Sequence, residues 1–212
     1  MNLQRLDDPQ EQLSTAPRLE ASRIDSFATL LSRAFHNEPD LVYMVQDEEA
    51  RRTVSLSFFQ AAIQAGLVFG EILTTDNADG VAVWISPDHD LPFRRTLRIG
   101  VIEFPSNLGC ESATRYMTLR ASVEEVRKRL APRPHWYLMA LGVETSLPET
   151  EIGDALIKPV LSRADSSGVP CYLETFSEKR LRFHMDFGFR ITGAGRIPDG
   201  GPNFWAMTRF PK

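Results

Sequence analysis

The most constraining feature of the sequence is an almost uniformly apolar stretch, WYLMALGV, at residues 136–143. A strand with apolar side chains on both faces has to be covered on both faces, as in the centre of a sheet flanked by helices. A second short strand, CYLET at 171–175, follows a segment in which Ala155, Leu156 and Leu161 form the apolar side of a helix. Strands alternating with helices in this way predict a mixed α/β fold.

The first half of the chain is rich in helical patterns. Apolar residues recur at helical spacing over 24–35, 48–65 and 116–130, and the last two helices flank a strand pair at 67–74 and 81–85. After the strand at 171–175 we expect a short helix over 178–187 and two terminal strands near 189–192 and 204–209. Residues 1–18 lack periodicity and predict a polar N-terminal arm, so that 19–212 form one domain.

Charge and cysteine content exclude several classes of protein. The 24 basic and 28 acidic residues give a net charge of −4, which disfavours a broadly basic surface for nucleic acid. Cys110 and Cys171 form neither a disulfide framework nor a cysteine–histidine cluster for zinc. The longest uncharged run, 53–70, is too short and too polar to span a bilayer. We therefore expect a cytoplasmic protein with no metal, no nucleic-acid partner and no membrane segment.

Several blocks in the last eighty residues carry a family resemblance. HWYLMALGV (135–143), ADSSGVPCYLET (164–175), FHMDFGF (183–189) and PDGGPNFWAMTR (198–209) resemble the Gcn5-related N-acetyltransferase (GNAT) family, and most of all its puromycin-type branch. Residues 19–40 are also similar to the family's opening strand and helix. The resemblance implies a GNAT fold, in which a mixed central sheet contains two parallel strands, here 136–143 and 171–175, that splay apart.

The same resemblance implies a donor and a reaction. Such proteins hold acetyl-coenzyme A or another acyl-coenzyme A in the gap between the splayed strands, where backbone groups near Leu141 and Val143 pair with the pantetheine amides. The pyrophosphate is held by a glycine-rich loop and a helix N-terminus, which places Gly153 and Asp154 among the cofactor-binding residues. The default reaction is acyl transfer to an amine of a small-molecule substrate.

The pyrophosphate loop departs from the family pattern. The pattern [Q/R]-x-x-G-x-[G/A] falls on PETEIG at 148–153, where only the final glycine is kept. Pro148 has no N–H to donate, and Glu149 and Glu151 add negative charge where a pyrophosphate would lie. These substitutions put the usual pose of coenzyme A in question.

The helix that follows CYLET also differs from its family counterpart. Arg180 stands at the position of an asparagine, and His184 stands where the family commonly has a tyrosine that protonates the departing thiolate. The reference pKa of histidine, near 6.5, suits proton transfer at neutral pH, so His184 is the candidate catalytic residue. Arg180 is a candidate phosphate ligand, because guanidinium groups bind phosphate well. Each residue also has a structural alternative, as a surface side chain of a short helix.

Four residues are candidates for the acceptor side. His36, beside Glu38, follows the first helix, and Trp84 ends the strand at 81–85. Glu174 and Thr175 end the second splayed strand. The alternatives are a solvated turn for His36, a core position for Trp84, and structural hydrogen bonds for Glu174 and Thr175.

Three functions follow. The leading hypothesis is an N-acyltransferase acting on a small amine. The first alternative is a biosynthetic enzyme of the same fold that performs a condensation or rearrangement by acid–base chemistry without coenzyme A, because the loop is degenerate. The second alternative is a non-catalytic homologue that binds a ligand.

Overall fold

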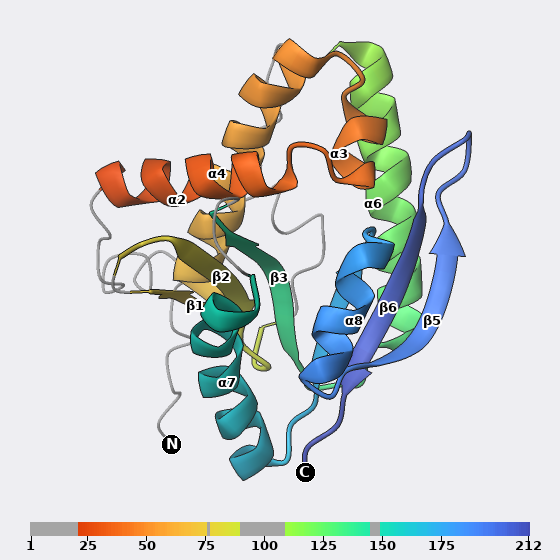
Figure 1. The fold of residues 1–212 in the computed structure, drawn as a ribbon. Coiled ribbons are helices and arrows are strands. Elements are labelled where there is room, and N and C mark those ends of the chain that lie inside the picture. Colours follow the sequence, from red (N-terminus) through yellow and green to blue (C-terminus); the bar gives the residue numbers. More distant parts are fainter. Residues whose placement is uncertain (1–20, 76, 90–108, 145–148) are drawn as a thin grey trace, which may run out of the picture.

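The computed structural model describes residues 21–75, 77–89, 109–144 and 149–212 (Figure 1). The predicted polar arm at 1–18 lies outside these residues. The elements are, in chain order, α2 (Ala21–Phe35), α3 (Pro39–Met44), α4 (Glu48–Phe69), β1 (Gly70–Thr74), β2 (Gly80–Ile85), α6 (Cys110–Leu130), β3 (Trp136–Val143), α7 (Glu149–Ser167), β4 (Cys171–Thr175), α8 (Glu178–Asp186), β5 (Arg190–Arg196) and β6 (Asn203–Arg209).

The strands form one mixed sheet in the order β1-β2-β3-β4-β6-β5. All neighbours are antiparallel except β3 and β4, which run parallel and are joined by the crossover helix α7. The two central strands have the predicted bounds, and both are largely buried. This architecture confirms the predicted mixed α/β class.

The parallel strands β3 and β4 pair only at their beginnings. Trp136 pairs with Cys171 and Tyr137 with Tyr172, and no further pair joins the two strands. From Leu138 to Val143 β3 remains paired with β2 on its other side. The sheet therefore opens between β3 and β4 along most of their length, as the splayed-strand prediction required.

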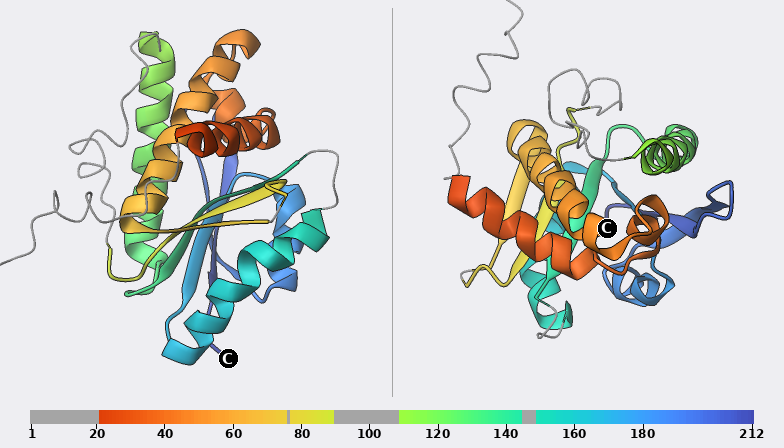
Figure 2. Two further views of the ribbon diagram at one scale, coloured as in Figure 1. Left: turned by 90° about the vertical axis from the view of Figure 1, so that its left-hand side faces the viewer. Right: turned by 90° about the horizontal axis from the view of Figure 1, so that it is seen from above.

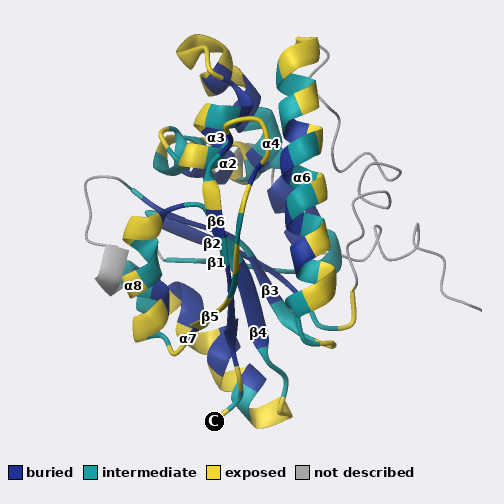
Figure 3. Cartoon of the chain, turned by 90° about the vertical axis from the view of Figure 1, so that its right-hand side faces the viewer, coloured by how far each residue is buried: buried dark blue, intermediate teal, exposed yellow. Residues whose placement is uncertain are grey.

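Helices cover both faces of the sheet (Figure 2). On one face α2 and α4 pack over β2 and β3, while α6 packs over β3, β4 and β6. On the other face α7 packs over β1, β2 and β3, and α8 lies beside β4. Figure 3 shows the buried strands between these partly exposed helices.

Several details differ from the sequence expectations. Helix α6 begins at Cys110, six residues before the expected start at 116, and β5 runs to Arg196, beyond the expected 189–192. The short helix α3 was not predicted, because its six residues are too few to show a helical period. Helix α4 runs on to Phe69, so the strand expected at 67–74 begins at Gly70. At Gly70 a Cβ would lie 1.9 Å from the Trp84 carbonyl oxygen, and this close approach of two backbones requires glycine. Helix α7 begins at Glu149, four residues before Gly153.

Candidate active site

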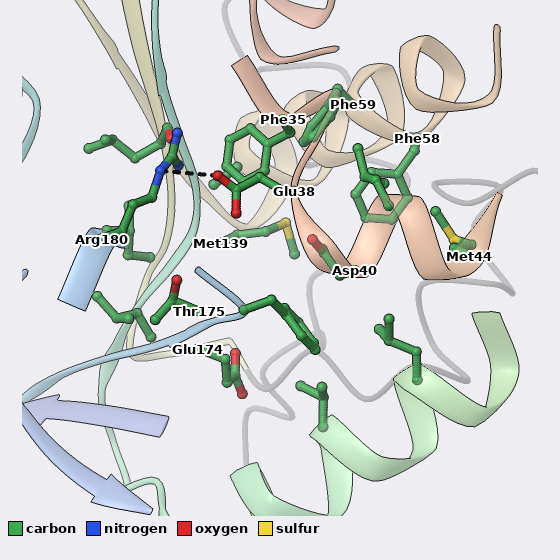
Figure 4. Close-up of a pocket in the computed structure, with 18 of the residues that line it drawn as sticks. Phe35, Glu38, Asp40, Met44, Phe58, Phe59, Met139, Glu174, Thr175 and Arg180 are labelled. Atoms are coloured by element: carbon green, nitrogen blue, oxygen red, sulfur yellow. Dashed lines mark hydrogen bonds and ion pairs between the residues drawn. The ribbon is translucent and has the colours of Figure 1, made fainter. Parts of the chain in front are cut away.

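A cavity lies where β3 and β4 separate, between the sheet and the helices α2, α3, α4 and α6 (Figure 4). Its volume is about 120 Å³, which is below the usual range for small-molecule sites. The sheet contributes residues 137–141 of β3 and 173–175 of β4, and α8 contributes Arg180 and His184. The splay of the strands thus creates a site that reaches from the sheet to the N-terminal helices.

One wall of the cavity is aromatic. Phe35 at the end of α2 lies 5.1 Å from Phe59 of α4 between ring centroids, and Phe58 lies 5.2 Å from Phe59. Tyr116 of α6 meets Phe58 edge-on at 6.4 Å. Opposite them, Met139 of β3 lines the same space. This wall favours an apolar or aromatic ligand body.

Two carboxylates from the connection after α2 line the cavity. Glu38 precedes α3, and its Oε1 lies 3.5 Å from Arg180 Nε. Asp40, in the first turn of α3, forms no direct ion pair with another described residue, although the charge of Arg180 favours its ionised form. Burial raises the pKa of Asp40 to about 6, and the negative charge of Glu38 adds to the rise. A carboxylate of this kind can exchange a proton near neutral pH.

Arg180 crosses the gap between the splayed strands. From α8, after β4, its Nη1 donates to the backbone carbonyl of Leu141 on β3 at 3.1 Å. Its guanidinium carbon lies 4.7 Å from the Phe35 ring centroid, in a cation–π contact. With the Glu38 ion pair, these contacts direct Arg180 toward β3 and the acceptor-side helices.

Glu174 of β4 belongs to a buried polar group at the floor of the cavity. Its Oε1 accepts a hydrogen bond from Arg127 Nε of α6 at 2.8 Å, and its side chain is 4% exposed. Arg127 also donates to the hydroxyl of Tyr137 at 3.2 Å, and burial raises the pKa of Tyr137 to about 12. Thr175 also lines the cavity, and its hydroxyl accepts from the backbone N–H of Ser177 at 3.2 Å. Both predicted acceptor-side residues therefore reach the cavity while also making structural hydrogen bonds.

His184 is buried at the cavity surface, not partly exposed as its structural alternative supposed. Its Nδ1 has no hydrogen-bond partner among the described residues. Burial lowers the pKa of His184 to about 3, and the charge of Arg180 lowers it further. The argument from a reference pKa near 6.5 is thereby corrected: at neutral pH the imidazole is uncharged, and it can donate a hydrogen bond but holds no spare proton.

Two residues predicted for the acceptor side lie outside the cavity. Trp84 is fully buried, and its Nε1 donates to the carbonyl of Leu156 on α7 at 3.1 Å. Because it faces α7, on the other side of the sheet from the cavity, Trp84 is a core residue. His36 points toward Glu48, with 3.5 Å between its Nε2 and Glu48 Oε1. The structure thus gives the structural alternative for Trp84 and a helix-end contact for His36.

The predicted donor-side residues are only partly brought together. Leu141 lines the cavity, whereas Val143 pairs with Gly80 of β2 at the far end of β3. Gly153 lies inside α7, where a Cβ would come within 2.6 Å of the Phe183 ring, so close packing against α8 explains its glycine. Asp154 forms an ion pair with Lys158 on the same helix.

The acidic loop is only partly described. Pro148 lies outside the described residues, and Glu149 and Glu151 are described only as part of α7. Contact between this loop and a pyrophosphate stays a prediction.

Within the described ranges, no group of histidine, cysteine, aspartate and glutamate side chains is arranged to hold a metal ion. Among the described helices, none combines the length and the apolar composition needed to cross a bilayer. The cytoplasmic location expected from the sequence stays a prediction.

Sequence reasoning did not single out Asp40, Arg127 or Tyr137. The only signal for Asp40 was its place two residues after Glu38, at the start of a segment that showed no period. Arg127 was expected on a helix, but its ion pair with Glu174 was not expected. The two residues are 47 positions apart, and such a contact leaves no local pattern in the sequence.

Known proteins resemble this chain in sequence and in fold. The chain is 25% identical over 182 residues to an uncharacterized N-acetyltransferase of Schizosaccharomyces pombe, covering 82% of this chain and 73% of that protein. A crystal structure described as histone acetyltransferase HPA2 and related acetyltransferase, from Corynebacterium glutamicum, has the same fold. Its TM-score is 0.61 and its identity is 24%, over 92% of this chain and 94% of that chain. The chain has the GNAT fold, and its sequence is similar to that of an N-acetyltransferase.

A second solved structure has the same fold. The C-terminal condensation domain of Ebony, in complex with beta-alanyl-dopamine, matches with a TM-score of 0.60 and 12% identity over 91% of this chain and 96% of that chain. No family model matches the chain. The likeness to the puromycin-type branch stays a prediction.

Proposed function

We propose that this GNAT-fold protein is an N-acyltransferase that moves an acyl group from an acyl-coenzyme A to the amine of a small molecule. The observation that carries the proposal is Asp40, a buried carboxylate whose pKa is raised to about 6, in a cavity that opens onto the splayed strands. A carboxylate in this setting attracts a substrate ammonium and can accept its proton. The aromatic wall beside it suits an amine with an apolar body.

In the proposed reaction, acyl-coenzyme A is the donor substrate and enters the gap between β3 and β4. Asp40 removes a proton from the bound ammonium, and the free amine attacks the thioester carbonyl. The tetrahedral intermediate collapses to an amide as the carbon–sulfur bond breaks, and the second proton of the attacking nitrogen passes to the departing sulfur, so that coenzyme A leaves as the thiol. His184, uncharged at neutral pH, serves in this scheme as a hydrogen-bond donor to the leaving sulfur.

Glu174 and Thr175 are proposed to contact the acceptor at the cavity floor. Glu174 is already neutralised by Arg127, so its role is to accept a hydrogen bond and not to balance a second buried charge. The cavity therefore fits a monoamine better than a polyamine. The second ammonium of a bound polyamine would lose its hydration without gaining an unpaired carboxylate.

A CoA-independent condensation is the second candidate function. Arg180 already donates a hydrogen bond to a backbone carbonyl in the gap, and a protein described as a condensation domain has the same fold. In this candidate the cavity binds both reactants, and Asp40 keeps its role as base.

The testing experiment measures thiol release from acetyl-coenzyme A with phenethylamine and with spermidine. We expect release with phenethylamine and little with spermidine, and a loss of roughly 10²-fold or more in kcat for Asp40→Asn. Glu111→Gln, on the exposed side of α6, is the matched control and should leave the rate unchanged. Asp40→Asn with wild-type rates would remove Asp40 from the mechanism. Absence of thiol release with both amines, and of coenzyme A binding up to millimolar concentration, would favour the condensation.

A further inference from the structure

The unpaired edge of β3 is the polar surface of the β3–β4 gap. Beyond Tyr137 the side of β3 that faces β4 has no strand partner, because the ladder between the two strands ends there. Backbone groups without a strand partner need hydrogen bonds from elsewhere, and an extended ligand with amide groups can supply them. In the gap, one of these groups, the carbonyl of Leu141, is already bonded by Arg180.

Several contacts hold Arg180 in this place. Its Nη1 donates to Leu141, its Nε lies 3.5 Å from Glu38, and its guanidinium carbon lies 4.7 Å from the Phe35 ring centroid. The side chain is only 17% exposed. A guanidinium that makes a charge-assisted hydrogen bond in a partly buried gap is costly to displace.

The position of Arg180 separates the two halves of the site. The residue comes from α8, after β4, yet its contacts are on β3 and on the connection between α2 and α3 (Figure 4). A chain of amide groups lying along β3 would meet the guanidinium at Leu141. The same movement that admits the chain would release Glu38 on the acceptor side.

We propose that Arg180 is a donor-selecting residue, which bars the β3 edge to an amide-bearing donor arm until it is displaced. The inference rests on the proposed function, because it assumes that the donor enters this gap. It follows that the binding-competent state is a minor one and that the apparent affinity for coenzyme A is reduced by its small population. It also follows that Arg180 acts against the pantetheine arm and not as a phosphate ligand.

The test compares the binding of coenzyme A and of pantetheine, which lacks the phosphates, to wild type and to Arg180→Asn by isothermal titration calorimetry. Asparagine keeps a polar side chain but is too short to reach Leu141 from α8. We expect Arg180→Asn to bind both probes at least about tenfold more tightly than wild type, and by a similar factor for each. Arg182→Asn is the matched control, because Arg182 is 85% exposed on the same helix and pairs with Asp186. Thermal unfolding confirms that each variant is folded.

Each other outcome is decisive. Weaker coenzyme A binding with unchanged pantetheine binding would show that Arg180 is a phosphate ligand and would overturn the proposal. Unchanged binding of both probes would overturn it as well. If wild type releases thiol from acetyl-coenzyme A while Arg180→Asn gains nothing, this inference fails and the proposed function stands. If only Arg180→Asn binds coenzyme A, the inference stands and the proposed donor of the natural protein is wrong. If neither protein binds either probe, both fail.

Discussion

Two titratable side chains at the cavity surface, Asp40 and His184, are held by burial closer to their uncharged forms. Burial raises the pKa of Asp40 to about 6 and lowers the pKa of His184 to about 3. The two shifts have the same origin, because a poorly solvated site disfavours charge of either sign. At neutral pH Asp40 is still mainly a carboxylate, while His184 is an uncharged imidazole. Asp40 can therefore accept a proton at neutral pH, whereas His184 can only donate or accept a hydrogen bond.

The pH dependence of the reaction separates these two residues. We expect kcat/KM to fall as the pH is lowered through about 6, because protonated Asp40 can no longer accept the proton of the ammonium. His184, whose pKa is about 3, should add no ionisation between pH 5 and 8. The measurement is a pH–rate profile for wild type, Asp40→Asn and His184→Gln. An acid limb that survives Asp40→Asn and disappears in His184→Gln would assign the titration to the histidine instead.

At the scale of elements, the approach of α7 to α8 depends on Gly153. A Cβ at this position would lie 2.6 Å and 2.7 Å from two carbon atoms of the Phe183 ring. Phe183 is in turn packed edge-on against Phe187, at 5.1 Å between centroids, so the ring has little room to move. The glycine is therefore explained by packing, although its place in the sequence also matched the last residue of a phosphate loop.

Gly153→Ala tests this packing, because we expect it to lower the free energy of unfolding, whereas the same change in most helices raises it. Alanine in a helix interior normally stabilises by about 1 kcal/mol relative to glycine. Here we expect a net loss of about 1–3 kcal/mol in the free energy of unfolding, because the added methyl group overpacks the interface. Urea unfolding measures the effect. Phe183→Leu in the same chain should recover part of the loss, and Gly109→Ala, with open space around its Cβ, is the control. A stabilised Gly153→Ala would show that the helices separate easily.

The elements differ in how far the sequence determines them. The bounds of β3 were predicted correctly, because a strand covered on both faces leaves a continuous apolar run. The start of β4 was predicted correctly because Gly168 and Pro170 break the chain before it. The bounds between α4 and β1 were not, since the apolar run 67–69 suits a buried helix as well as a strand. The ligand-facing groups depend on long-range contacts: Arg180 meets Leu141 across 39 residues, and no local pattern encodes that contact.

At the scale of the whole molecule, the sheet has two three-stranded halves, and the boundary between β3 and β4 is the seam where few residues pair. Strands β1, β2 and β3 form one half and β4, β6 and β5 the other, and only two residue pairs join β3 to β4. Helix α7 packs on the first half, and its Asp165 receives two hydrogen bonds from Arg209 of β6, at 2.8 Å from Nη1 and 2.7 Å from Nη2. This bidentate pair therefore ties the halves together beside the seam, at the end away from the cavity.

Asp165→Asn should accordingly destabilise the fold in a pH-dependent way. The hydrogen bonds from Arg209 lower the pKa of Asp165 from 3.8 to about 2, so the folded state favours the carboxylate. A lowered carboxyl pKa contributes stability that is fully present above pH 3.8 and is lost as the pH falls toward 2. We expect the Tm of Asp165→Asn to lie a few degrees below that of wild type at pH 7, and the difference to shrink as the pH falls from 4 to 2. Asp154→Asn, which removes an exposed pair within α7, should change the Tm little at either pH. A Tm difference that persists undiminished at pH 2 would show that the asparagine disturbs packing and that the ion pair does not hold the two half-sheets together.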